Sequence, residues 1–339
     1  CNTTEEPFDW AVLRLPMLAI SLLTSCFTSL FVNQVFGKRQ AYLTALSFMV
    51  LPVAVLSARI IAAENLLAML LMLGLWLLTL VKGKAEKQKK ILFLLGVISV
   101  AAPLLKLSGF ALPLIFAGLL WRMKKPLLAV SLGILGLVGI GTSIGYGCHY
   151  DCQLMQSLLA KHSQRPQTFW YFFTLFETPD IGYFAIKDSF AVLGIIGSIT
   201  LAISNRKAQD WLFIPWAVFG LIFVTVAPIE LYGWYKYLSF PLVAIGLGYV
   251  WNAFWERKLG WGLLLLPAIL VLIENFFQAQ PLFDDVRKLI ILGVFAPLFL
   301  FYLFPRLQKS KLYLGWVGTL FVFSVITQAL WTLSIIAKF

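Results

Sequence analysis

Three basic side chains stand in short turns between long apolar runs, where a charge is costly unless it has a partner or a task. Arg59 opens a very short turn, Lys106 separates two apolar runs, and Lys236 lies in an aromatic turn. An Arg offers a planar fork of donors and a Lys offers a compact charge, and both suit phosphate. The pattern predicts that Arg59, Lys106 and Lys236 bind one anionic group, a donor phosphate, at the outer membrane boundary.

The alternative is that each side chain extends from a helix end to the lipid headgroups. Any one of the three, taken alone, favours that alternative. Their shared position in tight turns on the same predicted side favours a common site.

Further polar residues flank these three. Glu64 either pairs with Arg59 or contacts a polar group of a substrate. Tyr237 and Glu230 lie close to Lys236 in the sequence and are further candidates for substrate contact. No residue is predicted to be the catalytic group, and no cluster with metal-ligand spacing is found.

The elements that must position these residues are predicted to be membrane helices. Of the 339 residues, 60% are hydrophobic and only 12% are charged, whereas soluble domains average roughly 25% charged residues. A helix needs about 20 apolar residues to cross the hydrocarbon core, and its backbone groups are satisfied within the segment. The composition predicts an all-α, polytopic integral membrane protein with about twelve transmembrane helices. Their spans are 13–32, 41–57, 66–81, 91–105, 109–121, 127–146, 189–203, 211–226, 238–255, 260–277, 289–304 and 313–337.

The charges fall unevenly on the two sides of these spans. With the first residue outside, the inner loops hold 17 of the 27 Lys and Arg and three acids, which leaves 10 bases and 12 acids outside. A basic excess in short loops marks the cytoplasmic side. The net charge of +12 therefore indicates orientation and not a nucleic-acid partner. We predict a multi-pass protein of a bacterial cytoplasmic membrane, with its active face outside.

The chain is predicted to be a single transmembrane domain, 1–339. Helices one to six occupy 13–146, an extracytoplasmic loop with an interfacial helix occupies 147–188, and helices seven to twelve occupy 189–337. Within the loop, leucines and Met155 share one helical face, which is typical of a helix lying on the membrane surface; an ordinary packed loop is the alternative. In the sixth helix, the spacing of Gly141 and Gly145 indicates close helix packing.

The four cysteines are Cys1, Cys26, Cys148 and Cys152. Cys26 lies in an apolar run and is interpreted as a small core residue. Cys148 and Cys152 either form a disulfide, if their loop faces an oxidising compartment, or remain free thiols. A zinc site is a weaker hypothesis, because the nearby histidines lack a recognised ligand spacing.

Several short motifs resemble the polyprenyl-phosphate-sugar glycosyltransferases with the GT-C fold, a group that includes protein O-mannosyltransferases and the lipid A aminoarabinose transferase. The likeness covers roughly 13–249 and is carried by Arg14-Leu15-Pro16, Ser57-Ala58-Arg59, Glu64-Asn65, Lys106-Leu107-Ser108-Gly109 and Tyr235-Lys236-Tyr237 with Pro241.

The resemblance implies a GT-C-like fold and a polyprenyl-phosphate-linked sugar donor. The acceptor would be a hydroxyl of a lipid, glycan or protein, and the basic residues would stabilise the departing polyprenyl phosphate. It also implies a first helix and an acidic loop that supplies the catalytic base before the Arg14 motif. Both are absent there, and we expect them upstream of Cys1.

No cofactor is predicted, since no GxxxxGK[ST] phosphate loop occurs; a need for a divalent metal stays open. Two other functions are kept as alternatives. The first is a transporter or flippase of lipid-linked sugars, which should show polar residues at mid-membrane and inverted repeats. The second is a non-catalytic, truncated homologue.

Overall fold

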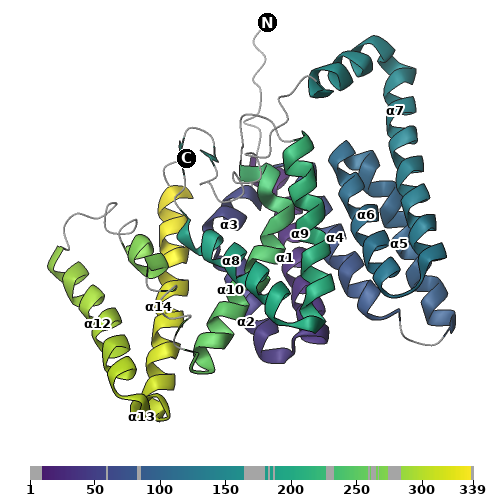
Figure 1. Ribbon diagram of the computed structural model, residues 1–339. Helices are drawn as coiled ribbons and strands as arrows, with labels where there is room; N and C mark the ends of the chain where they lie inside the picture. Colours follow the sequence, from purple (N-terminus) through teal and green to yellow (C-terminus); the bar gives the residue numbers. More distant parts are fainter. Residues whose placement is uncertain are drawn as a thin grey trace, which may run out of the picture.

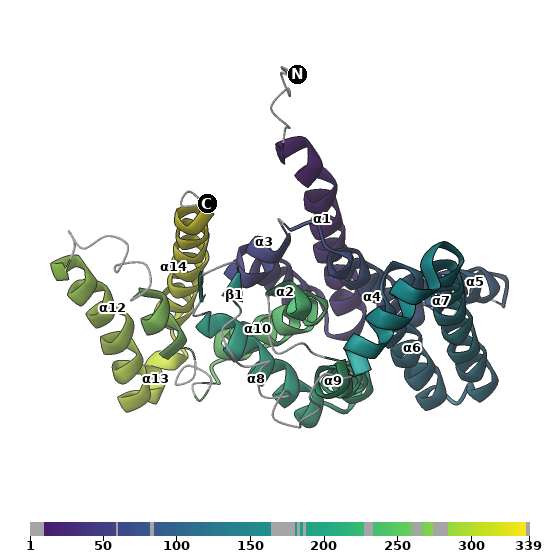
Figure 2. The ribbon, with the colours of Figure 1, turned by 90° about the horizontal axis from the view of Figure 1, so that it is seen from above.

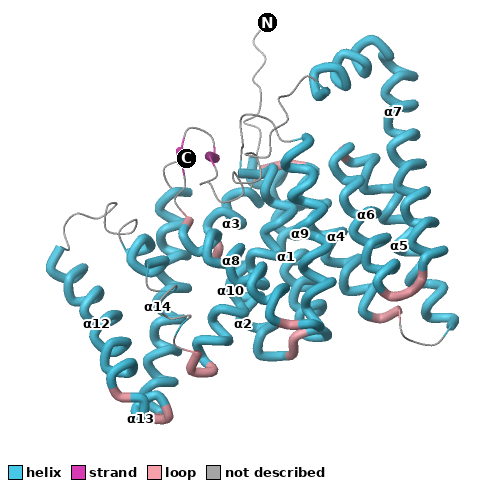
Figure 3. Tube along the Cα trace, in the orientation of Figure 1, coloured by secondary structure: helices cyan, strands magenta, loops and turns pink. Residues whose placement is uncertain are grey.

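The computed structural model is an elongated slab of helices that run roughly parallel and stand side by side (Figure 1). Seen from above, the slab extends from α5 and α7 at one end to α12 at the other (Figure 2). The all-α prediction is confirmed (Figure 3), and the described residues add only a pair of two-residue strands. The structure describes residues 10–58, 60–81, 85–163, 180–181, 184–185, 188–226, 233–258, 260, 265, 267–273 and 284–336.

The helices and strands have the following bounds. The first part of the chain contains α1 (Trp10–Val35), α2 (Lys38–Val50), α3 (Pro52–Ala58), α4 (Ala63–Thr79), α5 (Ala85–Leu105), the 3-10 helix η1 (Leu107–Phe110), α6 (Ala111–Arg122) and α7 (Pro126–Ser163). The second part contains β1 (Asp180–Ile181), β2 (Phe184–Ala185), α8 (Ser189–Ser204), α9 (Arg206–Val226), the 3-10 helix η3 (Gly233–Ser239), α10 (Phe240–Trp255), α12 (Asp284–Leu303), α13 (Pro305–Gln308) and α14 (Lys311–Ile336).

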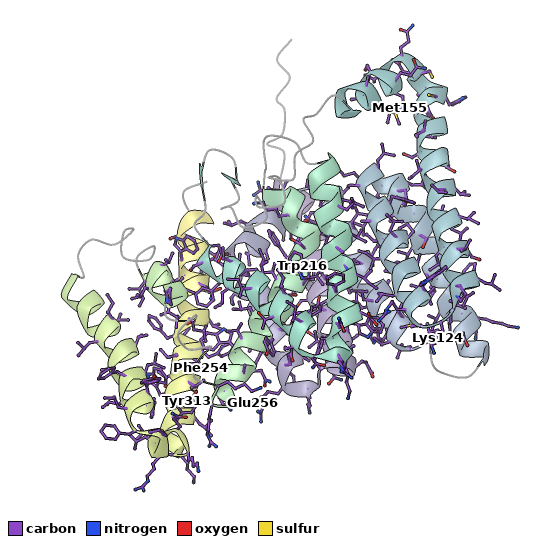
Figure 4. The ribbon with its side chains drawn as sticks, in the orientation of Figure 1. Lys124, Met155, Trp216, Phe254, Glu256 and Tyr313 are labelled. Carbon is purple, nitrogen blue, oxygen red and sulfur yellow. The ribbon has the colours of Figure 1, made fainter. Side chains whose placement is uncertain are left out.

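Helices α1, α6, α8, α10 and α12 finish at the same end of the slab, so the turns that follow them lie together there (Figure 1). Figure 4 shows Lys124 and Glu256 at this end and Met155 at the opposite end. We call it the basic end. Its described turns and helix starts carry Lys38, Arg39, Arg122, Lys124, Lys125, Arg206, Lys207, Arg257, Lys258, Arg306, Lys309 and Lys311.

The prediction of twelve transmembrane helices is not confirmed. Among the described residues, five helices are long and apolar enough to cross a membrane, namely Arg14–Val35, Gln88–Leu105, Pro126–Ala160, Lys236–Trp255 and Lys311–Ser334. Four further apolar helices, such as Ala63–Thr79, have only 10–17 residues, at or below the lower limit of the roughly 17–25 that a typical crossing needs. The predicted segment 260–277 lies largely outside the described residues.

The predicted second segment, 41–57, is interrupted. It forms α2 and α3, with Leu51 extended between them (φ −62°, ψ 112°). The reason is Pro52, because a proline disfavours the helical conformation in the residue before it. Helix α2 therefore ends at Val50, within the predicted segment, and the short helix α3 follows it up to Ala58.

The most enclosed of the five candidate spans is the one formed by α10. Of its apolar window 83% is buried, against 22–39% in the other four. Its neighbours α8 and α2 approach at backbone distance, because a Cβ on Gly246 would lie 1.9 Å from the Gly194 carbonyl oxygen and one on Gly248 would lie 2.4 Å from Thr44 Oγ1. Small residues that let helix backbones meet are a typical means of association in membranes.

Two smaller predictions are wrong. A Cβ on Gly141 or Gly145 would meet nothing within 4 Å, so their spacing does not mark helix packing. Cys26 is exposed on α1 and is not a core residue, because most of that helix's apolar window is unburied. An apolar run identifies a membrane helix without showing which of its faces meets protein and which meets lipid.

The boundary after the predicted sixth helix also differs. Helix α7 continues to Ser163, with one residue inside it, Asp151, departing from helical geometry (φ −156°, ψ 93°). Asp151 Oδ1 accepts a hydrogen bond from the Leu154 amide (2.8 Å), so it caps the helical turns that follow. The proposed surface helix is thus a bent continuation of α7 (Figure 1). Its position on a membrane surface stays a prediction. Five consecutive aromatic residues of the same loop, 169–173, lie outside the described residues.

Candidate functional site

The first turn of α4 carries a buried carboxylate. Asn65 donates a hydrogen bond from Nδ2 to the Ile60 carbonyl (2.7 Å) and contacts Met17 Sδ of α1 (3.6 Å), which fixes the approach to the helix. Ala62 is extended and precedes the helix, and Glu64 follows in its first turn with only 7% of its side chain exposed. A negative charge there is favoured by the helix dipole, although burial alone opposes it.

Lys106 is placed by a sharp turn between α5 and η1. Its amide bonds to the Ala102 carbonyl (3.3 Å), and the Gly109 amide bonds back to the Lys106 carbonyl (2.7 Å). A Cβ on Gly109 would lie 2.1 Å from the Ala102 carbonyl oxygen and 3.0 Å from Leu67 Cδ2 of α4. Glycine is therefore required for the turn to close against α4, and the Lys-Leu-Ser-Gly motif has a structural cause.

This turn brings Lys106 and Glu64 together. Lys106 Nζ donates a hydrogen bond to Glu64 Oε1, and the two side chains form an ion pair. The lysine side chain is 35% exposed, five times the exposed fraction of the glutamate side chain. An ammonium has three donors, and Lys106 uses one of them on the buried Glu64 carboxylate.

The second predicted lysine lies on η3, which packs against α3 and α4. Lys236 is 2% exposed, and Ser239 Oγ donates a hydrogen bond to its carbonyl (2.7 Å). With Pro241 at the start of α10, η3 leads directly into the most enclosed helix. The lysine is thus carried by a rigid segment beside the helix that bears Glu64.

Tyr237 fixes η3 from the other side. It is fully buried, its hydroxyl donates to Ser21 Oγ of α1 (3.3 Å), and its ring meets Phe48 of α2 edge-on. In a 3-10 helix, with three residues per turn, adjacent side chains point about 120° apart. Anchoring Tyr237 among α1 and α2 therefore sets the direction of Lys236, and a contact of Tyr237 with substrate stays a prediction.

The structure thus unites part of the predicted set. Glu64 and Lys106 are in contact, and Lys236 and Tyr237 lie on a segment packed beside α4. Arg59 and Glu230 lie outside the described residues. The pairing of Lys106 with Glu64 was not predicted, because the sequence analysis gave Arg59 or a substrate group as the partner of Glu64. Asn65 was named only as part of a motif and Ser21 was not named, and the contacts of both were not predicted, because polar residues in apolar runs carry no indication of their partners.

The site lies at the end of the bundle opposite the basic end, since α5 finishes and α4 begins there (Figure 1). The charged residues that the structure places there are the paired Lys106 and Glu64 and, on the neighbouring segment η3, Lys236. Among the residues that the structure describes, no group of three or more His, Cys, Asp or Glu could hold a metal ion.

Comparisons with known proteins give a structural match. No family model and no curated protein sequence matches the chain. The crystal structure of ArnT from Cupriavidus metallidurans in the apo state is similar with a TM-score of 0.56 and 17% sequence identity. The similarity covers 94% of this chain and 62% of that one, so this chain spans about three fifths of ArnT's length. ArnT is a lipid A aminoarabinose transferase of the GT-C kind, and the chain described here has the GT-C membrane fold.

Proposed function

We propose that the chain is the donor-binding membrane portion of a glycosyltransferase. The enzyme transfers a sugar from a polyprenyl-phosphate donor to an acceptor hydroxyl at the extracytoplasmic face. Lys106, Lys236 and Arg59 bind the donor phosphate. Glu64 holds Lys106 in place, while Tyr237 and Glu230 are assigned to the surroundings of the substrate.

The observation that carries the proposal is the pairing of a partly exposed Lys106 with a buried Glu64, next to the segment that carries Lys236. A lysine at a membrane boundary that served only to reach headgroups would not need a buried carboxylate to orient it. The GT-C fold and the position of the pair opposite the basic end add support.

The proposed chemistry uses these residues as an electrostatic clamp. The acceptor oxygen attacks the anomeric carbon, the bond to the phosphate oxygen breaks, and the electron pair leaves with the polyprenyl phosphate. Fixed ammonium groups stabilise that developing charge without reorganising during the reaction. The proton of the acceptor hydroxyl goes to a general base, for which the proposal names none of the described residues because Glu64 is already engaged with Lys106.

The experiment is a transfer assay on the full-length gene product in membranes, with labelled polyprenyl-phosphate sugars at varied concentration. Lys106→Met and Lys236→Met each remove a charge-assisted hydrogen bond worth about 1.5–3 kcal/mol. We expect donor use, measured as kcat/KM, to fall about 10- to 150-fold. Lys124→Met is the matched control, since Lys124 is an exposed lysine at the basic end, and it should leave transfer unchanged.

Each outcome separates the hypotheses. Equal effects of all three substitutions would show that Lys106 and Lys236 do not bind the donor phosphate. Donor movement across the membrane without sugar transfer would favour the flippase. Absence of transfer from every donor, with unchanged polyprenyl-phosphate binding, would favour a non-catalytic homologue.

A further inference from the structure

Helix α7 carries two thiols at its bend, on the same side of the bundle as the candidate site. Cys148 is half-buried and Cys152 is exposed, and their sulfur atoms lie 2.7 Å apart. Asp151, the residue that departs from helical geometry, stands between them. The bend and the thiol pair therefore occupy the same turn.

The spacing of the sulfurs is closer than an ordinary contact. Non-bonded heavy atoms settle roughly 3.5–4 Å apart, whereas a disulfide bond measures about 2.05 Å. The distance between Cys148 Sγ and Cys152 Sγ lies between these two values. Only a small movement would therefore bring the two sulfur atoms to bonding distance.

The bend itself is tightly built. A Cβ on Gly147 would lie 2.9 Å from Met155 Sδ, so the Met155 side chain, which follows the bend, reaches back to the turn before it. Figure 4 shows Met155 in this outer part of α7. A glycine contact and the Asp151 cap thus hold Cys152 near Cys148 independently of any bond between them.

We propose that Cys148 and Cys152 form a disulfide within α7 that fixes its bend. Two S–H bonds break and one S–S bond forms, and the two electrons and two protons pass to the disulfide of an extracytoplasmic thiol–disulfide oxidoreductase, which leaves as a dithiol. The exchange proceeds through a mixed disulfide on the more exposed Cys152. The proposal rests on the orientation that places this end outside, where disulfides persist.

The consequence of the bond is local. Only three residues separate the cysteines, so the cross-link constrains the unfolded chain little. It instead holds the outer part of α7, residues 153–163, at one angle to the membrane-crossing part. That outer part carries Leu154 and Leu158 exposed, and its direction decides what these apolar side chains contact.

The bond is tested on the full chain with Cys1→Ser and Cys26→Ser, in sealed right-side-out membrane vesicles. A membrane-impermeant maleimide should add no label before reduction and two labels after treatment with an impermeant phosphine. Cys148→Ser should add one label without reduction. Two labels on the unreduced protein would overturn the proposal, as would labelling that requires permeabilised vesicles, because these thiols would then face the cytoplasm.

The fixing of the bend is tested by hydrogen exchange. Reduction should speed exchange of the amides of residues 154–160 at least fivefold, while those of residues 112–120 in α6 stay unchanged. The Cys148→Ser/Cys152→Ser protein should exchange at the fast rate with or without the phosphine. Equal rates in oxidised, reduced and doubly substituted protein would show that the bond does not hold the bend.

Discussion

At the scale of single residues, the contact between Glu64 and Lys106 decides how the site is interpreted. A carboxylate buried near a membrane boundary is unfavourable by itself, and the lysine compensates it. The side chain of the same lysine is 35% exposed. One residue therefore serves stability and, under the proposed function, phosphate binding, and the two roles are separable by paired substitutions.

We expect Lys106→Met to lower the midpoint of thermal unfolding in detergent, because it leaves the Glu64 carboxylate buried and uncompensated. Removing one partner of a fully buried pair costs about 3–5 kcal/mol, and the partial exposure of Lys106 places this loss at about 1–3 kcal/mol. Adding Glu64→Gln to Lys106→Met should restore the midpoint, since a neutral amide tolerates the site. Circular dichroism on heating measures both changes.

The double variant should stay inactive although it is stable. It retains the fold and lacks the ammonium, so polyprenyl-phosphate-dependent transfer should remain as low as in Lys106→Met. Recovery of transfer together with stability would show that Lys106 matters only for folding.

At the scale of elements, close glycine contacts hold the enclosed helix α10. We expect Gly246→Ala to destabilise the protein by about 1–3 kcal/mol, the usual cost of overpacking, because its new Cβ would collide with the backbone of α8. Gly141→Ala is the control, since nothing lies within 4 Å of its added Cβ and alanine favours the helix by roughly 0.5–1 kcal/mol. Thermal unfolding of the two variants should shift in opposite directions. A loss at both positions would mean that the contact at Gly246 is not the cause.

The same elements show what the sequence could predict and what it could not. The helical class, the order of the apolar segments and the Lys106 turn follow from composition and from the Lys-Leu-Ser-Gly motif. Hydropathy could not distinguish Gly246, which meets another backbone, from Gly141, which meets nothing, because both lie in uniformly apolar runs. Nor could it pair Glu64 with Lys106, since they lie 42 positions apart in the sequence and the contact depends on how α5 returns beside α4. The break at Leu51 could have been predicted, because Pro52 is visible in the sequence.

At the scale of the whole molecule, one end of the slab gathers the basic turns and the other carries the candidate site (Figure 1). A membrane orients such a molecule by its short basic loops. The proposed donor phosphate, the acceptor and an oxidised thiol pair all require that the end of the slab with the candidate site faces the extracytoplasmic side.

We therefore expect Leu154→Cys, in a chain whose four natural cysteines are serines, to react with an impermeant maleimide on intact cells. Lys124→Cys should react only after the membrane is permeabilised. Both natural side chains are exposed. Lys124 lies in the turn before α7, and Leu154 lies in the outer part of α7, next in the chain to Met155 (Figure 4), so access to the reagent differs only by side. Reversed labelling would mean that the orientation is inverted and that Lys106 faces the cytoplasm. The loops with 17 bases and three acids would then lie outside, against the rule that basic loops stay in the cytoplasm. Labelling of both positions on intact cells would mean that α7 does not cross the membrane between them.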